Sequence, residues 1–144
     1  MTVKQLSVFV ENRPGRLAEI TRLLGNNGIS IKAMSIADTK DFGILRLIVN
    51  DSDKALDVLK KNNCAVTLTD VLAIKISNKA GGLAEAVEVL YKANISVEYM
   101  YAAFIKERED TAFVILRADD KDGAVEALKV SGFDLINQND LINF

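Results

Sequence analysis

The 144-residue sequence contains no histidine and no tryptophan, and it has one cysteine and one proline. Histidine is the usual general base near neutral pH and the commonest metal ligand. The chain therefore lacks the residue that most often fills either role. The single cysteine, Cys64, excludes an internal disulfide and a thiolate cluster for zinc. The Asp and Glu residues fall mostly on polar helix faces and hairpin tips, and they form no catalytic constellation. The sequence therefore predicts that the protein is not an enzyme and that it holds no metal or cofactor.

Two further absences narrow the choice of partner. The formal net charge is only −2 and aromatic residues make up 6% of the chain, whereas a nucleic-acid-binding surface needs clustered Lys and Arg. No run approaches the roughly 20 apolar residues of a membrane span, and residues 1–5 do not resemble a signal peptide. We therefore expect no nucleic acid, no membrane and a cytoplasmic location.

What the chain does contain is an internal repeat. Residues 12–19 return 66 positions later as residues 78–85, and this register holds from Asn12 to Lys40 with 11 identities in 29 positions. Beyond that point the offset is taken as 68 for Leu45–Val49 and as 69 for the helix that follows. Extra residues between strands are expected of a duplicated unit, because loops tolerate insertion. The repeat predicts two modules, residues 1–69 and 70–144.

The periodicity of each copy predicts the order β-α-β-β-α-β. In the first copy, an alternating strand over 5–10 is followed by a helix with Pro14 at its first position, an extended segment, a turn at Asp41–Gly43, a strand over 44–49, a second helix and a last strand. This is the ferredoxin-like split motif. The expected fold class is α+β, with two such modules packed side by side, each an antiparallel sheet with helices on one face. Residues 140–144 are read as a further strand or as the end of the last one.

Each copy places a glycine, Gly15 or Gly81, between its first strand and first helix. Glycine lets the backbone turn tightly and be approached closely, and the helix start offers unpaired N–H groups to a carboxylate. Asn12 and Asn78 lie just upstream, and the hydroxyls of Ser30 and Ser96 follow 18 residues later. These groups suit the carboxylate and ammonium of an α-amino acid. They are equally consistent with Asn and Gly that merely build the turn.

The pattern Asn-x-Pro-Gly-x-Leu-Ala-Glu-Ile, followed by a helix and Gly-Ile-Ser-Ile, resembles the ACT domain, a small amino-acid-sensing module. The resemblance covers both halves; the second departs from it, with Ala80 in place of proline and an additional Gly82. It implies a ligand held between paired modules by the loop before the first helix and by the start of the second strand. The implied residues are Asn12, Arg13, Pro14, Gly15, Arg16, Leu17, Ser30, Ile31, Asn78, Lys79, Gly81, Gly82, Leu83, Ser96 and Val97.

The resemblance therefore implies a regulatory, allosteric amino-acid sensor without a catalytic domain. Its expected partners are a free amino acid, a second copy in a homodimer and a metabolic enzyme or regulator. The alternative is an oligomerisation or interaction scaffold of the same fold that binds no ligand. Binding of an amino acid separates the two.

Overall fold

The structure is a computed structural model that describes residues 1–37, 40–103 and 109–143. It divides into two compact units. Lys4–Thr69 is called the first module below, and Asp70–Phe144 together with Met1–Val3 is called the second module. The division expected from the sequence, at residues 69 and 70, differs in the placement of Met1–Val3.

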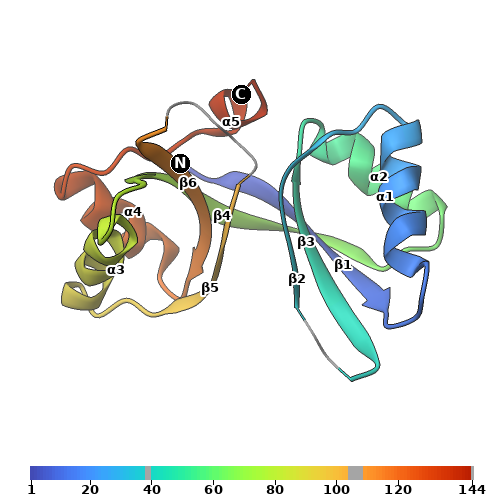
Figure 1. The fold of residues 1–144 in the computed structure, drawn as a ribbon, viewed down its shortest axis with the longest axis horizontal. Helices are drawn as coiled ribbons and strands as arrows, with labels where there is room; N and C mark the ends of the chain where they lie inside the picture. Colours follow the sequence, from blue (N-terminus) through green and yellow to red (C-terminus); the bar gives the residue numbers. More distant parts are fainter. Residues whose placement is uncertain (38–39, 104–108, 144) are drawn as a thin grey trace. The chain divides into compact units, whose positions relative to one another are not determined.

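The first module has the expected β-α-β-β-α-β order (Figure 1). Its sheet has the strand order β2-β3-β1-β4, and both β1 and β2 pair with β3 in the antiparallel sense. Helices α1 and α2 pack against each other on one face of this sheet (Figure 1). The elements are β1 (Val3–Glu11), α1 (Arg16–Asn26), β2 (Ile31–Ala37), β3 (Phe42–Val49), α2 (Ser52–Lys61) and the first part of β4 (Val66–Ser77).

The second module repeats this arrangement, starting from the later part of β4. Strand β6 pairs with β4 on one side and with β5 on the other, antiparallel in both cases. The last strand position is a short segment, Asp134–Ile136, which joins β4 through a bridge between Leu135 and Ile74. The remaining elements are α3 (Gly82–Lys92), β5 (Val97–Ala102), β6 (Thr111–Ala118), α4 (Lys121–Val130) and α5 (Gln138–Ile142).

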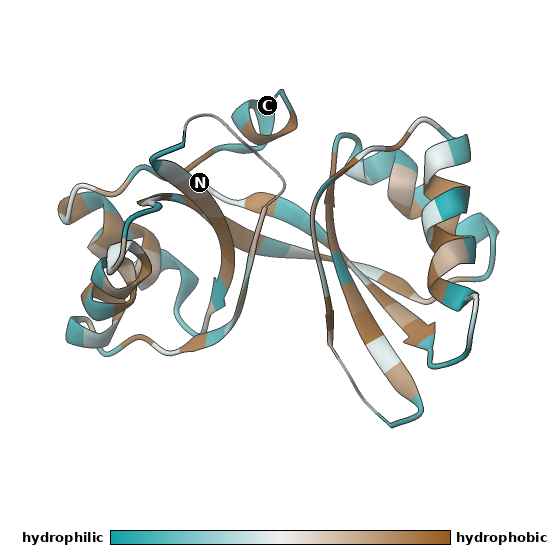
Figure 2. Cartoon of the chain, viewed as in Figure 1, coloured by the Kyte–Doolittle hydropathy of each residue, from teal (hydrophilic) through white to brown (hydrophobic). Residues whose placement is uncertain are grey.

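Each module has its own hydrophobic core between its sheet and its helices, and Figure 2 shows the apolar strands that supply it. In the first module Leu6 and Val8 alternate with outward residues along β1, and Ile20 and Leu24 project from α1 at a spacing of four. All four side chains are almost fully buried. The predicted α+β class of two βαββαβ modules is therefore confirmed.

Strand pairing shows that the offset between the two copies of the repeat changes in one step, from 66 to 69. Leu6 lies opposite Leu47 in the first module, and Leu72 lies opposite Leu116 in the second, so β3 and β6 correspond at an offset of 69. The offset of 68 assigned from the sequence is wrong by one residue. Because successive residues of a strand face opposite sides, that slip would have exchanged the buried and outward positions of the whole strand. All three additional residues lie in the β5–β6 hairpin.

Three local predictions also need correction. Phe42 and Gly43 are not a turn but the first residues of β3. Pro14 is not the first helical residue, because Gly15 is the N-cap and α1 begins at Arg16. The segment Gln138–Ile142 is the helix α5 rather than a strand, with Phe144 outside the described residues. Its N-cap Asn137 accepts a hydrogen bond from Asp140 N at 2.8 Å, and polar residues of this kind favour caps over strands.

Candidate functional site

The loop between β1 and α1 turns at Gly15, which has φ +86° and ψ −15°. The corresponding Gly81, between β4 and α3, has φ +86° and ψ −7°. These are left-handed conformations that side-chain-bearing residues rarely adopt. Glycine at both positions is therefore favoured by the backbone of the loop itself, before any ligand is considered.

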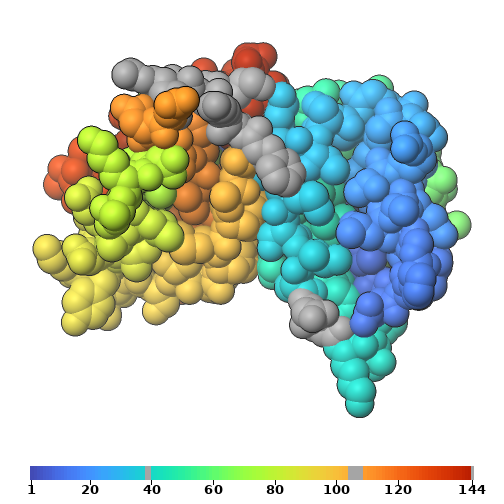
Figure 3. All heavy atoms as spheres, viewed as in Figure 1, coloured from blue at the N-terminus to red at the C-terminus, as the bar shows by residue number. Residues whose placement is uncertain are grey.

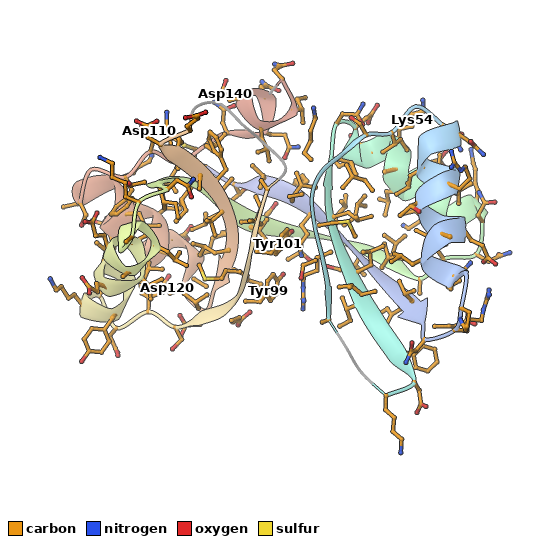
Figure 4. The ribbon with its side chains drawn as sticks, viewed as in Figure 1. Lys54, Tyr99, Tyr101, Asp110, Asp120 and Asp140 are labelled. Carbon is orange, nitrogen blue, oxygen red and sulfur yellow. The ribbon has the colours of Figure 1, made fainter. Side chains whose placement is uncertain are left out.

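The helices that follow these two glycines differ at their starts from the other helices of the described chain. The N-caps Asp51, Asp120 and Asn137 each accept a hydrogen bond from a backbone N–H of their own helix; Asp120 is labelled at the start of α4 in Figure 4. Gly15 and Gly81 offer no such side chain to α1 and α3. The first N–H of each helix is already used, because Arg16 N donates to Arg13 O at 3.3 Å and Gly82 N donates to Lys79 O at 3.0 Å. The N–H groups of the next two residues, Leu17 and Ala18 in α1 and Leu83 and Ala84 in α3, can donate to an acceptor from outside the helix.

The two asparagines upstream of the glycines fasten the loop to the neighbouring hairpin. Asn12 N donates to Asp41 O at 3.0 Å, and its Nδ2 donates to Lys40 O at 3.4 Å. In the second module, Asn78 N and Nδ2 donate to Asp110 O at 2.9 Å and to Glu109 O at 3.2 Å. Figure 4 labels Asp110, which directly precedes β6. The donor atoms of both asparagines thus serve the fold, and the side-chain carbonyl oxygens take no part in these bonds.

The two arginines of the first loop are held by a carboxylate of their own module. Arg13 binds both carboxylate oxygens of Glu19, at 3.3 and 3.1 Å, and Arg16 Nη1 lies 3.2 Å from Glu19 Oε2. Arg13 also contacts Glu11 at 3.3 Å. Hydrogen bonds from Arg13 and then Arg16 lower the pKa of Glu19, and those to Glu19 and Glu11 raise the pKa of Arg13. A ligand carboxylate would have to compete with Glu19 for either arginine.

Arg16 also extends away from the loop. Its Nη2 lies 3.7 Å from Cys64 Sγ, while its Nε is buried without a hydrogen-bond partner among the described residues. It lines a separate cavity of about 220 Å³ with Cys64 and Asn62. Arg16 is therefore more a packing residue of α1 than a residue of the loop.

A larger cavity, of about 410 Å³, lies beside the first loop. Its lining joins the end of β1, the loop, the first turn of α1, the end of β2 and the start of β3. Three of its residues belong to the set implied by the resemblance: Asn12, Arg13 and Leu17. Sequence reasoning missed the other five, which are Val10, Glu11, Ile36, Ala37 and Gly43. Figure 3 shows that the start of β3 stands at the surface of this module, where Phe42 is 54% exposed.

Ser30 and Ile31 lie at the other end of the same module. Helix α1 begins at the loop and has 11 residues, which corresponds to a rise of about 16 Å. Ser30 follows the end of this helix, where its N–H donates to Asn50 Oδ1 at 3.0 Å and its carbonyl accepts from Asn50 N at 3.1 Å. Ser96 makes the same pair of bonds with Asp119 in the second module. The structure thus does not bring Ser30 and Ile31 to the loop of their own module, nor Ser96 and Val97 to theirs.

The loop of the second module is drawn more tightly onto its strand. A side chain added at Gly82 would overlap the carbonyl oxygen of Ser77, so only glycine fits there. Lys79 N bonds Ser77 Oγ at 3.2 Å, which also closes the turn. Leu83, on the first turn of α3, is 42% exposed. Among the described residues, no group of three or more Cys, Asp or Glu side chains could hold a metal ion.

The comparisons with known proteins agree with this geometry. The whole sequence, residues 1–144, matches the family model of the ACT domain pair. The chain belongs to this family. The resemblance drawn from the loop motifs is confirmed, and the ACT pair is a regulatory module rather than a catalytic one.

Solved structures carry the same fold. Protein BT0572 from Bacteroides thetaiotaomicron is 42% identical, with a TM-score of 0.93 over 100% of this chain and 98% of that one. The regulatory subunit of aspartate kinase from Thermus thermophilus, in its ligand-free form, is 15% identical, with a TM-score of 0.65 over 90% and 91%. The subunit from Thermus flavus is 16% identical, with a TM-score of 0.61 over 89% and 91%. At such identities the two kinase subunits show the fold alone. No curated protein matches the sequence, and no described helix is long and apolar enough to cross a membrane.

Proposed function

We propose that this ACT pair is an amino-acid sensor that regulates another protein. The observation that supports this most is the site around Gly15. There an α-helix without a side-chain cap begins beside a cavity of about 410 Å³, and that cavity has an apolar wall and a polar rim. The N–H groups of Leu17 and Ala18 suit the ligand carboxylate. The Glu11 carboxylate at the rim, whose Oε2 accepts from Arg13 Nε at 3.3 Å, has its other oxygen for the ligand ammonium group. A volume of this size is typical of small-molecule sites.

The remaining polar groups of the proposed site come from a second module. Ser30 and the loop are separated within one module by the length of α1, and a free amino acid is too short to reach both. The loop of one module and the second-strand start of a paired module therefore complete the site in our proposal. For this reason we also propose a homodimer, which supplies further modules for such pairing. A metabolic enzyme or a regulator receives the signal, and the cytoplasmic location expected from the sequence stays a prediction.

One observation favours the alternative, a scaffold of ACT fold without a ligand. Both Arg13 and Arg16 are already engaged by Glu19, so neither guanidinium is offered to a ligand. In our proposal the carboxylate is bound by backbone N–H groups instead, and the Glu19 cluster keeps the loop in its shape. The two readings differ in whether any amino acid stabilises the protein.

A thermal-shift screen against the 20 standard amino acids tests the proposal. A ligand at 100 times its Kd adds about 2.7 kcal/mol to the free energy of unfolding, which raises Tm by roughly 5–10 °C in a protein of this size. Gly15→Val removes the shift, because a β-branched residue blocks the approach to the helix start and disfavours the left-handed turn. Circular dichroism shows whether that variant is folded. If no amino acid moves the Tm of the parent protein, the scaffold reading replaces the sensor.

A further inference from the structure

One residue on the floor of the cavity beside the first loop, Gly43, has no side chain. Val10 and Gly43 are opposite each other in the pairing of β1 with β3. Val10 faces the helices and is 4% exposed, and its partner on the same face has no side chain. A Cβ added at Gly43 would lie 3.0 Å from Ala37 O and 3.6 Å from Ile36 Cγ1. A methyl group there would therefore enter the space between β3 and β2 that borders the cavity.

The second module carries different residues at the corresponding positions. Ile76 takes the position of Val10, and its partner across the strand pair is Ala112 rather than glycine. Ala102, which pairs with Val114 as Ile36 pairs with Leu45, replaces the larger apolar wall residue. The preceding loop is also tighter, because Gly82 packs against the Ser77 carbonyl. The wall residue, the floor residue and the loop of this place thus all differ between the two modules.

We propose that the first module selects an α-amino acid with an aliphatic side chain, that Gly43 sets the size of that side chain, and that the loop of the second module binds no ligand. This inference rests on the sensor function proposed above. The ligand side chain lies against Val10, Leu17 and Ile36, and its charged groups remain at the rim with Glu11 and Asn12. A charged or amide side chain would be left without partners among these apolar groups, and that costs affinity.

Calorimetric titration of the 144-residue protein tests the selectivity directly. The probes are glycine, alanine, valine, leucine, phenylalanine, aspartate and lysine. We expect one ligand per chain, with affinity rising from glycine to leucine by about 10-fold or more for each step that fills the pocket. Gly43→Ala weakens valine and leucine by at least about 10-fold and leaves alanine nearly unchanged. The matched change in the second module, Ala112→Gly, leaves all affinities and the stoichiometry unchanged.

A second variant keeps the test decisive if Gly43→Ala fails to fold. Ile36 is 49% exposed and lies outside the core cluster, so Ile36→Ala enlarges the cavity without emptying the core. We expect it to move the preference from leucine toward phenylalanine. Two bound ligands per chain, a preference for aspartate or lysine, or a leucine-to-alanine affinity ratio unaffected by both variants would overturn this inference and leave the sensor function standing. If no amino acid binds the parent protein, the proposed function itself is wrong.

Discussion

The backbone of the loop before α1 leads to a prediction about two glycines with different backbone conformations. Apart from the chain neighbours and, for Gly25, the backbone of its own helix, no atom lies within 4 Å of the place where a Cβ would stand at Gly15 or Gly25, so alanine meets no clash at either site. Gly15 has φ +86°, while Gly25 lies in the last turn of α1. Alanine in a left-handed conformation costs about 1–2 kcal/mol, whereas alanine in place of a helical glycine gains about 0.5–1 kcal/mol.

These free energies translate into Tm shifts of opposite sign. An unfolding entropy of about 2.1 cal/mol/K per residue gives about 0.3 kcal/mol/K for this chain. Gly15→Ala is therefore expected to lower Tm by about 3–7 °C, and Gly25→Ala to raise it by about 2–3 °C. Gly15→Asn loses less than Gly15→Ala, because asparagine tolerates the left-handed region better. The assay is scanning calorimetry without added amino acids, so that ligand binding does not contribute.

A Gly15→Ala variant with the parent Tm, or two alanine variants whose Tm values move in the same direction, would refute this prediction. Either result would mean that the loop relaxes to an ordinary φ at no cost, and Gly15 would then not be fixed by the backbone. Its role in the loop would have to come from close approach of a ligand alone.

Two further predictions concern the α4 cap and the arginine cluster. Asp120 Oδ1 accepts from Gly123 N at 2.9 Å, so Asp120→Ala is expected to cost about 1 kcal/mol in urea unfolding while Asp120→Asn keeps most of it; equal stability of the two variants would contradict the capping role. The folded-state pKa of Glu19 is lowered, so its contribution to stability is present above its unfolded pKa and is lost as the pH falls through its folded pKa. By NMR titration, Arg13→Gln should raise the pKa of Glu19 more than Arg16→Gln does, and the reverse order would show that Arg13 is not its main partner.

Most of the fold followed from periodicity in the sequence, and the errors have identifiable physical causes. Alternation located β1, and a four-residue spacing of apolar side chains located α1, because these patterns match the geometry of strand and helix. The same pattern failed in β3, where Leu45, Leu47, Ile48 and Val49 are all buried. A strand that is apolar on both faces carries no alternation, so nothing in the sequence prevented the one-residue slip against β6. Strand pairing corrected it.

The lining of the cavity beside the first loop was predicted less completely than the fold. The loop residues were found from their motif, but the wall and floor of the cavity come from β2 and β3, which are distant in sequence and carry no motif. Gly43 becomes meaningful only once its register partner Val10 is known. The ion pair between Arg13 and Glu19, six residues later, could likewise not be predicted from the sequence. The two side chains meet only when the loop has folded back beside α1.

In this ACT pair, comparison of the two modules distinguishes residues that build the loop from residues that could select a ligand. Asn12 and Asn78 make the same bonds to their hairpins, and Gly15 and Gly81 share one backbone conformation, so identity at these positions is explained by the loop alone. A ligand imposes no such identity on two modules that take different roles. The residues that differ between the copies, Gly43 against Ala112 above all, are therefore where ligand selectivity should be sought. The repeated residues mark the proposed site, and the residues that differ between the two copies are the ones to test for the choice of ligand.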